Sequence, residues 1–141
     1  MTAQDQSGIA GWIAARGTVT TAKTRTFPRE LTAARSARRF VAEAVGLHPA
    51  RGDAVLLASE LVANSVLHAH DAHTVSIVVA ISAAFVRIDV WDDGTTGIPH
   101  MRDTDDGTEG GRGLHLVNQL ARRWGFERSP GRTCCWAEIV G

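Results

Sequence analysis

The chain has almost no lysine and no excess of charge of either sign. Lys23 is its only lysine, and the 15 basic residues balance 15 acidic ones in a chain of 141 residues. Without a net charge there is no overall field to attract nucleic acid or an anionic membrane, so we expect neither as a direct partner. Because no lysine follows Lys23, any later cationic contact to a phosphate must come from arginine.

Long apolar runs and cysteines are also scarce. No stretch approaches the roughly 20 apolar residues that a membrane span needs, and the N-terminus lacks the order of a signal peptide. Cys134 and Cys135 are the only cysteines and are adjacent, which is too few for a disulfide framework. Neighbouring residues of a strand point to opposite faces, so we expect two reduced thiols. The sequence therefore predicts a cytoplasmic protein with one core.

The hydrophobic periodicity predicts one α+β domain at residues 19–141 behind a flexible tail at residues 1–18. In chain order we expect a strand at 19–27, helices at 31–45 and 49–70, strands at 74–82 and 84–91, a helix at 113–123, and strands at 124–128 and 133–140. This order favours a two-layer α/β sandwich, with a mixed, mostly antiparallel sheet and helices on one face. Ile9, Trp12 and Ile13 leave open a short packing helix within the tail.

One predicted helix carries a polar stripe. Glu60, Asn64 and His68 follow one another at steps of four residues through an otherwise apolar run. Each step departs from a full turn by only about 40°, so the three side chains share one face. The apolar flanks indicate burial, where a carboxylate beside a carboxamide needs partners. The carboxamide suits Mg²⁺ and the carboxylate can orient or deprotonate a hydroxyl or water, whereas a solvated helix face is the plain alternative.

Two further clusters follow later in the chain. Asp92 and Gly94 end an apolar strand, where a carboxylate can accept a hydrogen bond from an amine such as that of adenine and a glycine lets a ring approach. Residues 110–114 are rich in glycine and lead into a helix, so their N–H groups offer an anion site. Taken alone, the first cluster is an ordinary turn and the second a common helix entry. The second also differs from the P-loop and from the dinucleotide-binding glycine motif.

In combination these segments are far more specific than any one of them. They are Glu60-Leu61-Val62-Ala63-Asn64, Asp92-Asp93-Gly94, Gly111-Arg112-Gly113-Leu114 and Gly131-Arg132-Thr133. They resemble the N box, G1 box, G2 box and closing threonine of the GHKL ATPase superfamily, which has the Bergerat fold. The resemblance runs from about Pro28 to Val140. It is strongest to the small stand-alone members, the anti-sigma-factor serine kinases and their relatives.

The resemblance assigns roles at the metal and the adenine. It implies that Asn64 binds Mg²⁺ and that Glu60 serves as the general base or positions a water molecule. It implies that Asp92 holds the adenine amino group and that Gly94 lets the ring approach. Thr133 would complete the adenine pocket directly or through water, although a strand also favours threonine for its shape alone. ATP and Mg²⁺ are therefore the expected cofactors.

The resemblance also assigns the phosphate contacts. Gly111 and Gly113 would offer backbone donors, Arg112 would add charge, and Leu114 completes the same box. The segment 99–110 would be the ATP lid, and it is short and acidic. Acidic groups repel a triphosphate, so we expect its aspartates to face solvent or a partner.

The sequence departs from the superfamily pattern in the G1 box. The second glycine of D-x-G-x-G is replaced by Thr96, and Gly97 comes one residue late. The adenine end of the site is thus less well defined by the sequence than the metal end. We expect the histidines to be satisfied or exposed rather than to bind phosphate or metal; they are His68, His70, His100 and His115.

The resemblance implies an ATP-dependent serine/threonine protein kinase. Its substrate would be a serine of an anti-anti-sigma (STAS) partner, and a sigma factor would compete for the same protein. The alternative is a catalytically inactive nucleotide-binding module, which the altered G1 box favours and Glu60 opposes. A detached histidine-kinase catalytic domain is disfavoured, because no helix pair with a phosphoacceptor histidine is present. The sequence leaves a homodimer open.

Overall fold

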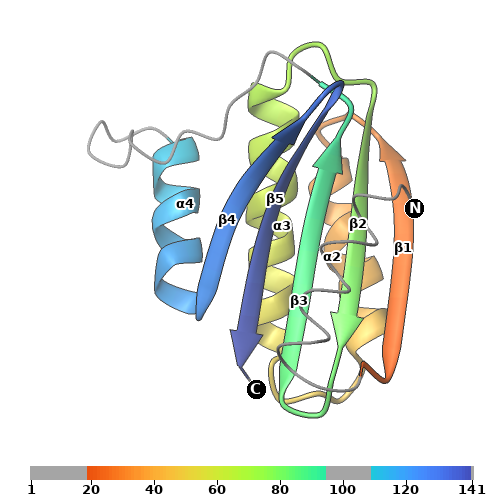
Figure 1. The fold of residues 1–141 in the computed structure, drawn as a ribbon, viewed down its shortest axis with the longest axis vertical. Coiled ribbons are helices and arrows are strands. Elements are labelled where there is room, and N and C mark those ends of the chain that lie inside the picture. The colour runs from red at the N-terminus through yellow and green to blue at the C-terminus, as the bar shows by residue number, and fades with distance from the viewer. Residues whose placement is uncertain (1–18, 95–108, 141) are drawn as a thin grey trace.

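The computed structural model describes residues 19–94 and 109–140 (Figure 1). In chain order the elements are β1 (Thr21–Pro28), α2 (Ala33–Val45), α3 (Arg51–His68), β2 (Thr74–Ile81), β3 (Phe85–Asp92), α4 (Glu109–Leu120), β4 (Arg123–Ser129) and β5 (Arg132–Val140). Each element has the type that the sequence predicts. The largest difference is the start of α4, which lies at Glu109 rather than at Gly113. The predicted tail at residues 1–18 and the predicted lid lie outside the described residues.

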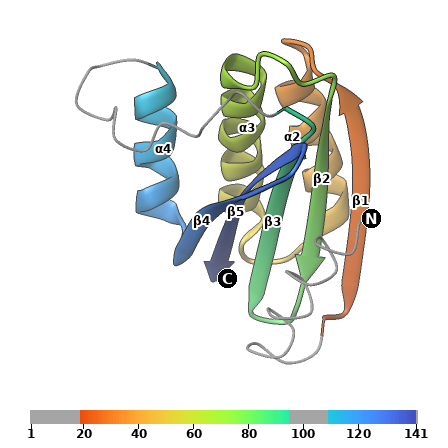
Figure 2. The same ribbon diagram turned by 45° about the horizontal axis from the view of Figure 1, so that its top comes forward.

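The strands form one five-stranded sheet in the order β1-β2-β3-β5-β4. All four neighbouring pairs of the described strands are antiparallel, so the mixed part of the predicted sheet is not found among them. The helices α2 and α3 cover one face, and α4 lies beside α3 beyond the edge at β4 (Figures 1 and 2). The predicted α+β two-layer sandwich is confirmed.

The helix α2 is amphipathic, as its sequence predicts. Its buried residues recur at steps of three and four, at Ala33, Ala37, Phe40, Val41 and Val45. The helix ends at Gly46, which has a φ of 61° and whose N–H donates to the carbonyl of Ala42 at 3.1 Å. The next helix, α3, instead buries residues around most of its circumference and so lies at the centre of the molecule.

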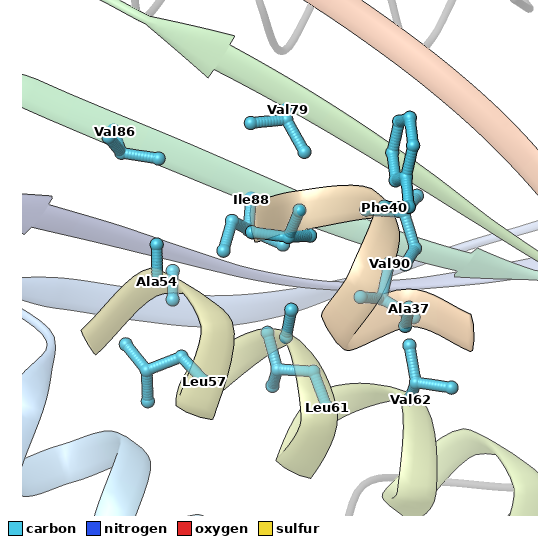
Figure 3. Packing of buried hydrophobic residues seen from close by; sticks show 14 of the residues in the cluster. Ala37, Phe40, Ala54, Leu57, Leu61, Val62, Val79, Val86, Ile88 and Val90 are labelled. Atoms are coloured by element: carbon cyan, nitrogen blue, oxygen red, sulfur yellow. The ribbon is translucent and has the colours of Figure 1, made fainter. Parts of the chain in front are cut away.

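The core lies between these two helices and the sheet. Figure 3 shows Leu57 and Leu61 of α3 on the side of the sheet where Ile88 and Val90 of β3 point, and all four side chains are fully buried. Burying each such side chain contributes about 1.5–3 kcal/mol. This packing fixes α3 against β3, and the polar residues of both elements are held together as a result.

The two cysteines lie on opposite faces of β5, as predicted. Cys135 belongs to the core under the helices, whereas Cys134 is buried on the other face with Val78, Ala80 and Trp91. Both thiols are free. No helix among residues 19–94 and 109–140 is long and apolar enough to cross a membrane.

Candidate functional site

The helix α3 places a buried amide at the centre of the predicted site. Asn64 is 8% exposed, while Glu60, one turn earlier, is half-buried. The Oδ1 atom of Asn64 is buried and accepts no hydrogen bond from the described residues. A buried acceptor without a donor is unfavourable by about 1–3 kcal/mol. The Asn64 carbonyl therefore has a coordination position to offer.

Asp92 lies at the end of β3 and is held by two neutral donors. The hydroxyl of Ser65 donates to Oδ2 at 3.1 Å, and the N–H of Gly94 donates to Oδ1 at 3.0 Å. A carboxylate has about four lone-pair sites, so each oxygen of Asp92 can accept a further hydrogen bond. Ser65 directly follows Asn64, so the residue that holds this carboxylate is the chain neighbour of the buried amide.

The ionised form of Asp92 is disfavoured by its position. Burial raises the pKa of this carboxyl above its usual value, and the hydrogen bonds from Gly94 and Ser65 oppose the rise without cancelling it. Nearby negative charge from Asp93 and Asp71 adds to the rise. A ligand that donates a hydrogen bond to Asp92 would favour the ionised form, so proton loss and ligand binding are linked at this residue.

Gly94 is required by packing within the protein. A Cβ atom at this position would lie 2.8 Å from Oδ1 of Asp71 and 3.2 Å from the Cβ atoms of Ala69 and Ala72. The glycine thus lets the end of β3 lie against the loop between α3 and β2. The sequence assigned this glycine to the approach of a ring. The structure adds a second reason, the close packing of Gly94 against Ala69 and Ala72, which does not involve a ligand.

Thr133 completes the described part of the site. It pairs with Asp92 across β3 and β5, is 4% exposed, and donates from Oγ1 to the carbonyl of Gly94 at 3.4 Å. The structure therefore brings Asp92, Gly94 and Thr133 together at one end of the sheet, and Asn64 directly precedes Ser65, which hydrogen-bonds to Asp92.

The sequence did not identify two contributors to this end of the sheet. Ser65 fixes one oxygen of Asp92, and Asp93 accepts the N–H groups of His73 at 2.7 Å and Thr74 at 3.1 Å. Burial opposes the ionisation of Asp93, but the backbone hydrogen bonds from Thr74, His73 and Asp93 itself, together with the nearby His73 side chain, outweigh it and lower its pKa. A serine next to Asn64 in an apolar helix was the one local signal for Ser65. Asp93 offered none beyond its place in a turn.

The glycines of the G2 box lie inside a helix rather than ahead of it. Because α4 begins at Glu109, Gly111 falls in the first turn, where backbone N–H groups have no partner within the helix, and Gly113 falls beyond it. The prediction of a helix entry at Gly113 is therefore wrong by four residues, because the helix extends through glycines despite their low helix propensity. The side chains of residues 109–114, including Arg112 and Leu114, lie outside the described part of the structure.

The histidines take no part in a metal cage within the described residues. His70 and His115 are exposed, and His115 lies 3.3 Å from the amide of Gln119. No group of three or more His, Cys, Asp or Glu residues among residues 19–94 and 109–140 could hold a metal ion. The open carbonyl of Asn64 does fit Mg²⁺, which takes one or two protein oxygens together with phosphates and water.

Comparison with known proteins places the chain in a family. The family model of the histidine kinase-like ATPase domain matches residues 27–139. The chain therefore belongs to the histidine kinase-like ATPase domain family, and its resemblance to the GHKL superfamily is confirmed. A comparison with curated proteins finds no match.

Two solved structures are similar to the chain. A structure of the RsbU and RsbW domains of Rv1364c from Mycobacterium tuberculosis has a TM-score of 0.63 and 20% identity, over 86% of this chain and 33% of that one. The histidine kinase domain of a blue-light activated kinase from Erythrobacter litoralis has a TM-score of 0.46 and 26% identity, over 63% of this chain and 43% of that one. The chain spans less than half the length of either protein. The first comparison shows a shared fold.

Proposed function

We propose that the chain binds ATP with Mg²⁺ and transfers the γ-phosphoryl group to a serine or threonine of a partner protein. Membership in the histidine kinase-like ATPase domain family supports ATP as the ligand. The single observation that carries the proposal is the buried Oδ1 of Asn64, which has no hydrogen-bond partner within residues 19–94 and 109–140. It lies next in the chain to Ser65, which holds the buried carboxylate of Asp92. The phosphate end of ATP requires an oxygen that binds the accompanying cation, and the adenine end requires an acceptor for its amino group.

At the adenine end the chain would recognise an exocyclic amine. Asp92 accepts this group with lone pairs that Ser65 and Gly94 leave free, and Thr133 lies beside it. At the phosphate end Asn64 offers its carbonyl to the cation. When bound, Mg²⁺ neutralises phosphate charge and orients the γ-phosphoryl group.

Glu60 is our candidate for the general base. It lies one helical turn from Asn64, close to where the phosphates would be. The acceptor oxygen forms a bond to phosphorus while the bond between the β,γ-bridging oxygen and the γ-phosphorus breaks, and ADP leaves. The proton of the acceptor hydroxyl passes to Glu60, so the carboxylate must be ionised beforehand.

The resemblance to anti-sigma-factor kinases suggests the partners. We propose a STAS-domain anti-anti-sigma protein as the phosphoacceptor and a sigma factor as its competitor. In that case phosphorylation of the STAS serine would decide which partner the chain holds. The chain would then act as a regulator of transcription through exchange of partners.

Phosphoryl transfer can be measured directly. The purified chain is incubated with radiolabelled ATP, Mg²⁺ and candidate STAS proteins, and label on the STAS protein is counted. We expect transfer by wild type, a loss of about 100-fold or more in Glu60→Gln, and no change in Asp53→Asn, which alters an exposed carboxylate of the same helix. ATP binding without transfer to any STAS candidate would instead support the inactive nucleotide-binding module.

A further inference from the structure

The face of the sheet that points away from α2 and α3 is buried at its centre. We call this the outer face; its central residues are Val78 and Ala80 of β2, Arg87, Asp89 and Trp91 of β3, and Cys134, Trp136 and Glu138 of β5. Ala80 is 0% exposed, Val78 and Cys134 are 1% exposed, and Trp91 is 3% exposed. Side chains on an uncovered sheet face stand in solvent, so another part of the molecule must lie over them.

The described elements do not supply this cover. The helices α2 and α3 lie on the opposite face, and α4 lies beside α3 beyond β4 (Figures 1 and 2). Arg87 and Arg132 stack on Trp136 and Trp91, which shields the rings but not the small side chain of Ala80. None of the elements in residues 19–94 and 109–140 therefore lies over Ala80 on this face.

The buried strip has the width of one helix. It spans β2, β3 and β5, which is two strand spacings or about 10 Å, close to the diameter of an α-helix. At its two sides the outer face is open, because Ala22 and Thr24 of β1 and Glu127 of β4 are exposed. One helix laid along the strip would bury its centre and leave these residues free.

The N-terminal end of the described chain lies at the outer face. Val19, the first described residue, packs against the cluster of Val78, Ala80, Trp91 and Cys134. The other candidate, the segment 95–108, connects Gly94 at the end of the sheet to α4 on the helix layer and is mostly acidic and polar. Residues 1–18 carry Ile9, Trp12 and Ile13, whose spacing puts three apolar side chains on one side of a helix.

We propose that residues 1–18 form a helix that covers the outer face, with Trp12 as its central contact. This segment is then part of the folded domain, on the side opposite the nucleotide site. The proposal is independent of the proposed function, since no residue of the outer face contributes to the site at Asn64 and Asp92.

The adjacent cysteines provide a test with an internal control. Burial raises the pKa of both thiols, so both should react slowly with an alkylating reagent in the folded wild-type protein. In the 141-residue chain that carries Trp12→Asp, we expect the alkylation rate of Cys134 to rise about tenfold or more, with that of Cys135 unchanged. Tandem mass spectrometry assigns the label to either thiol. Ala14→Asp adds the same charge about 200° away around a helix and should leave both rates as in wild type.

A rate for Cys134 in Trp12→Asp equal to that of wild type would overturn the proposal. Equal acceleration of the alkylation of both thiols would show that Trp12→Asp unfolds the whole domain. In that case a cross-linking measurement tests where residue 12 lies. A photoreactive phenylalanine derivative replaces Trp12 in the otherwise wild-type chain. Cross-links within the same chain to β2, β3 or β5 support the proposal. Cross-links to α2 or α3, or to a second copy of the chain, contradict it.

Discussion

Strand β3 buries two carboxylates, and their surroundings differ in kind. In the middle of the strand, Asp89 is 1% exposed and receives the guanidinium of Arg87 at 2.6 Å. At the end of the strand, Asp92 is 6% exposed, and the hydrogen bonds described for it come from neutral groups, the hydroxyl of Ser65 and the N–H of Gly94. Among the residues that the structure describes, Asp89 thus has a cationic partner, whereas Asp92 has neutral donors.

This difference in hydrogen-bond partners indicates a structural role for Asp89 and a binding role for Asp92. A buried ion pair such as Arg87 and Asp89 is satisfied by the fold and has no need of a ligand. A buried carboxylate that keeps free lone pairs has a raised pKa because its ionised form is unfavourable, and such carboxylates are typical of functional sites. Substitutions at the two positions should therefore separate stability from binding.

The largest effect on stability is expected from Arg87→Met. This change leaves Asp89 buried without its guanidinium and should lower the free energy of unfolding by about 3–5 kcal/mol. ATP affinity of the folded protein should not change, because the ion pair lies on the outer face. Chemical unfolding and a binding titration measure the two quantities. Arg35→Met, at an exposed arginine of α2, is the control and should shift stability by less than about 0.5 kcal/mol.

The opposite outcome is expected from Asp92→Asn. The asparagine offers one acceptor fewer and turns an N–H group toward the site, so ATP affinity should fall about 100-fold. The free energy of unfolding should stay within about 1 kcal/mol, since the ionised carboxylate is itself disfavoured by burial. Asp93→Asn serves as the matched change at the neighbouring, exposed carboxyl and should retain ATP affinity. Equal losses of affinity in both variants would remove Asp92 from the adenine end.

A smaller change in stability is expected from Gly94→Ala. The new Cβ atom would crowd Ala69 and Ala72 at 3.2 Å, and such overpacking destabilises by about 1–3 kcal/mol. Gly52→Ala is the control, because a Cβ atom there meets nothing within 4 Å. Thermal unfolding should therefore give a lower midpoint for the first variant and an equal or higher one for the second.

The smallest effect concerns pH. Binding of an amine to Asp92 needs the ionised carboxylate, so ATP affinity should fall as the pH drops through the raised pKa of this group, by at most about tenfold per pH unit. Asp93, whose pKa is lowered, stays ionised over the same range. ATP itself also titrates, so the comparison is with Asp92→Asn. That variant should lose the part of the pH dependence that belongs to Asp92.

The sequence predicted the elements, and it named most of the residues of the candidate site, because both rest on local patterns. Hydrophobic periodicity is local, and the stripe on α3 and the turn after β3 are each visible within a few residues. Ser65 to Asp92 and Asp93 to His73 are contacts across 27 and 20 residues, which no local pattern reveals. The start of α4 was missed because glycines commonly mark a helix boundary, whereas here they lie inside the helix. The burial of the outer face was not predicted either, because this face mixes apolar and charged side chains, which does not distinguish a buried face from an exposed one.

The most direct test of the account is the Mg²⁺ dependence of ATP binding at Asn64. Calorimetric titrations with and without Mg²⁺ compare wild type with Asn64→Ala. We predict that Mg²⁺ strengthens ATP binding to wild type by about 10- to 100-fold and has no such effect on the variant. An equal strengthening in both proteins would contradict the assignment of the Asn64 carbonyl as the oxygen that holds the cation.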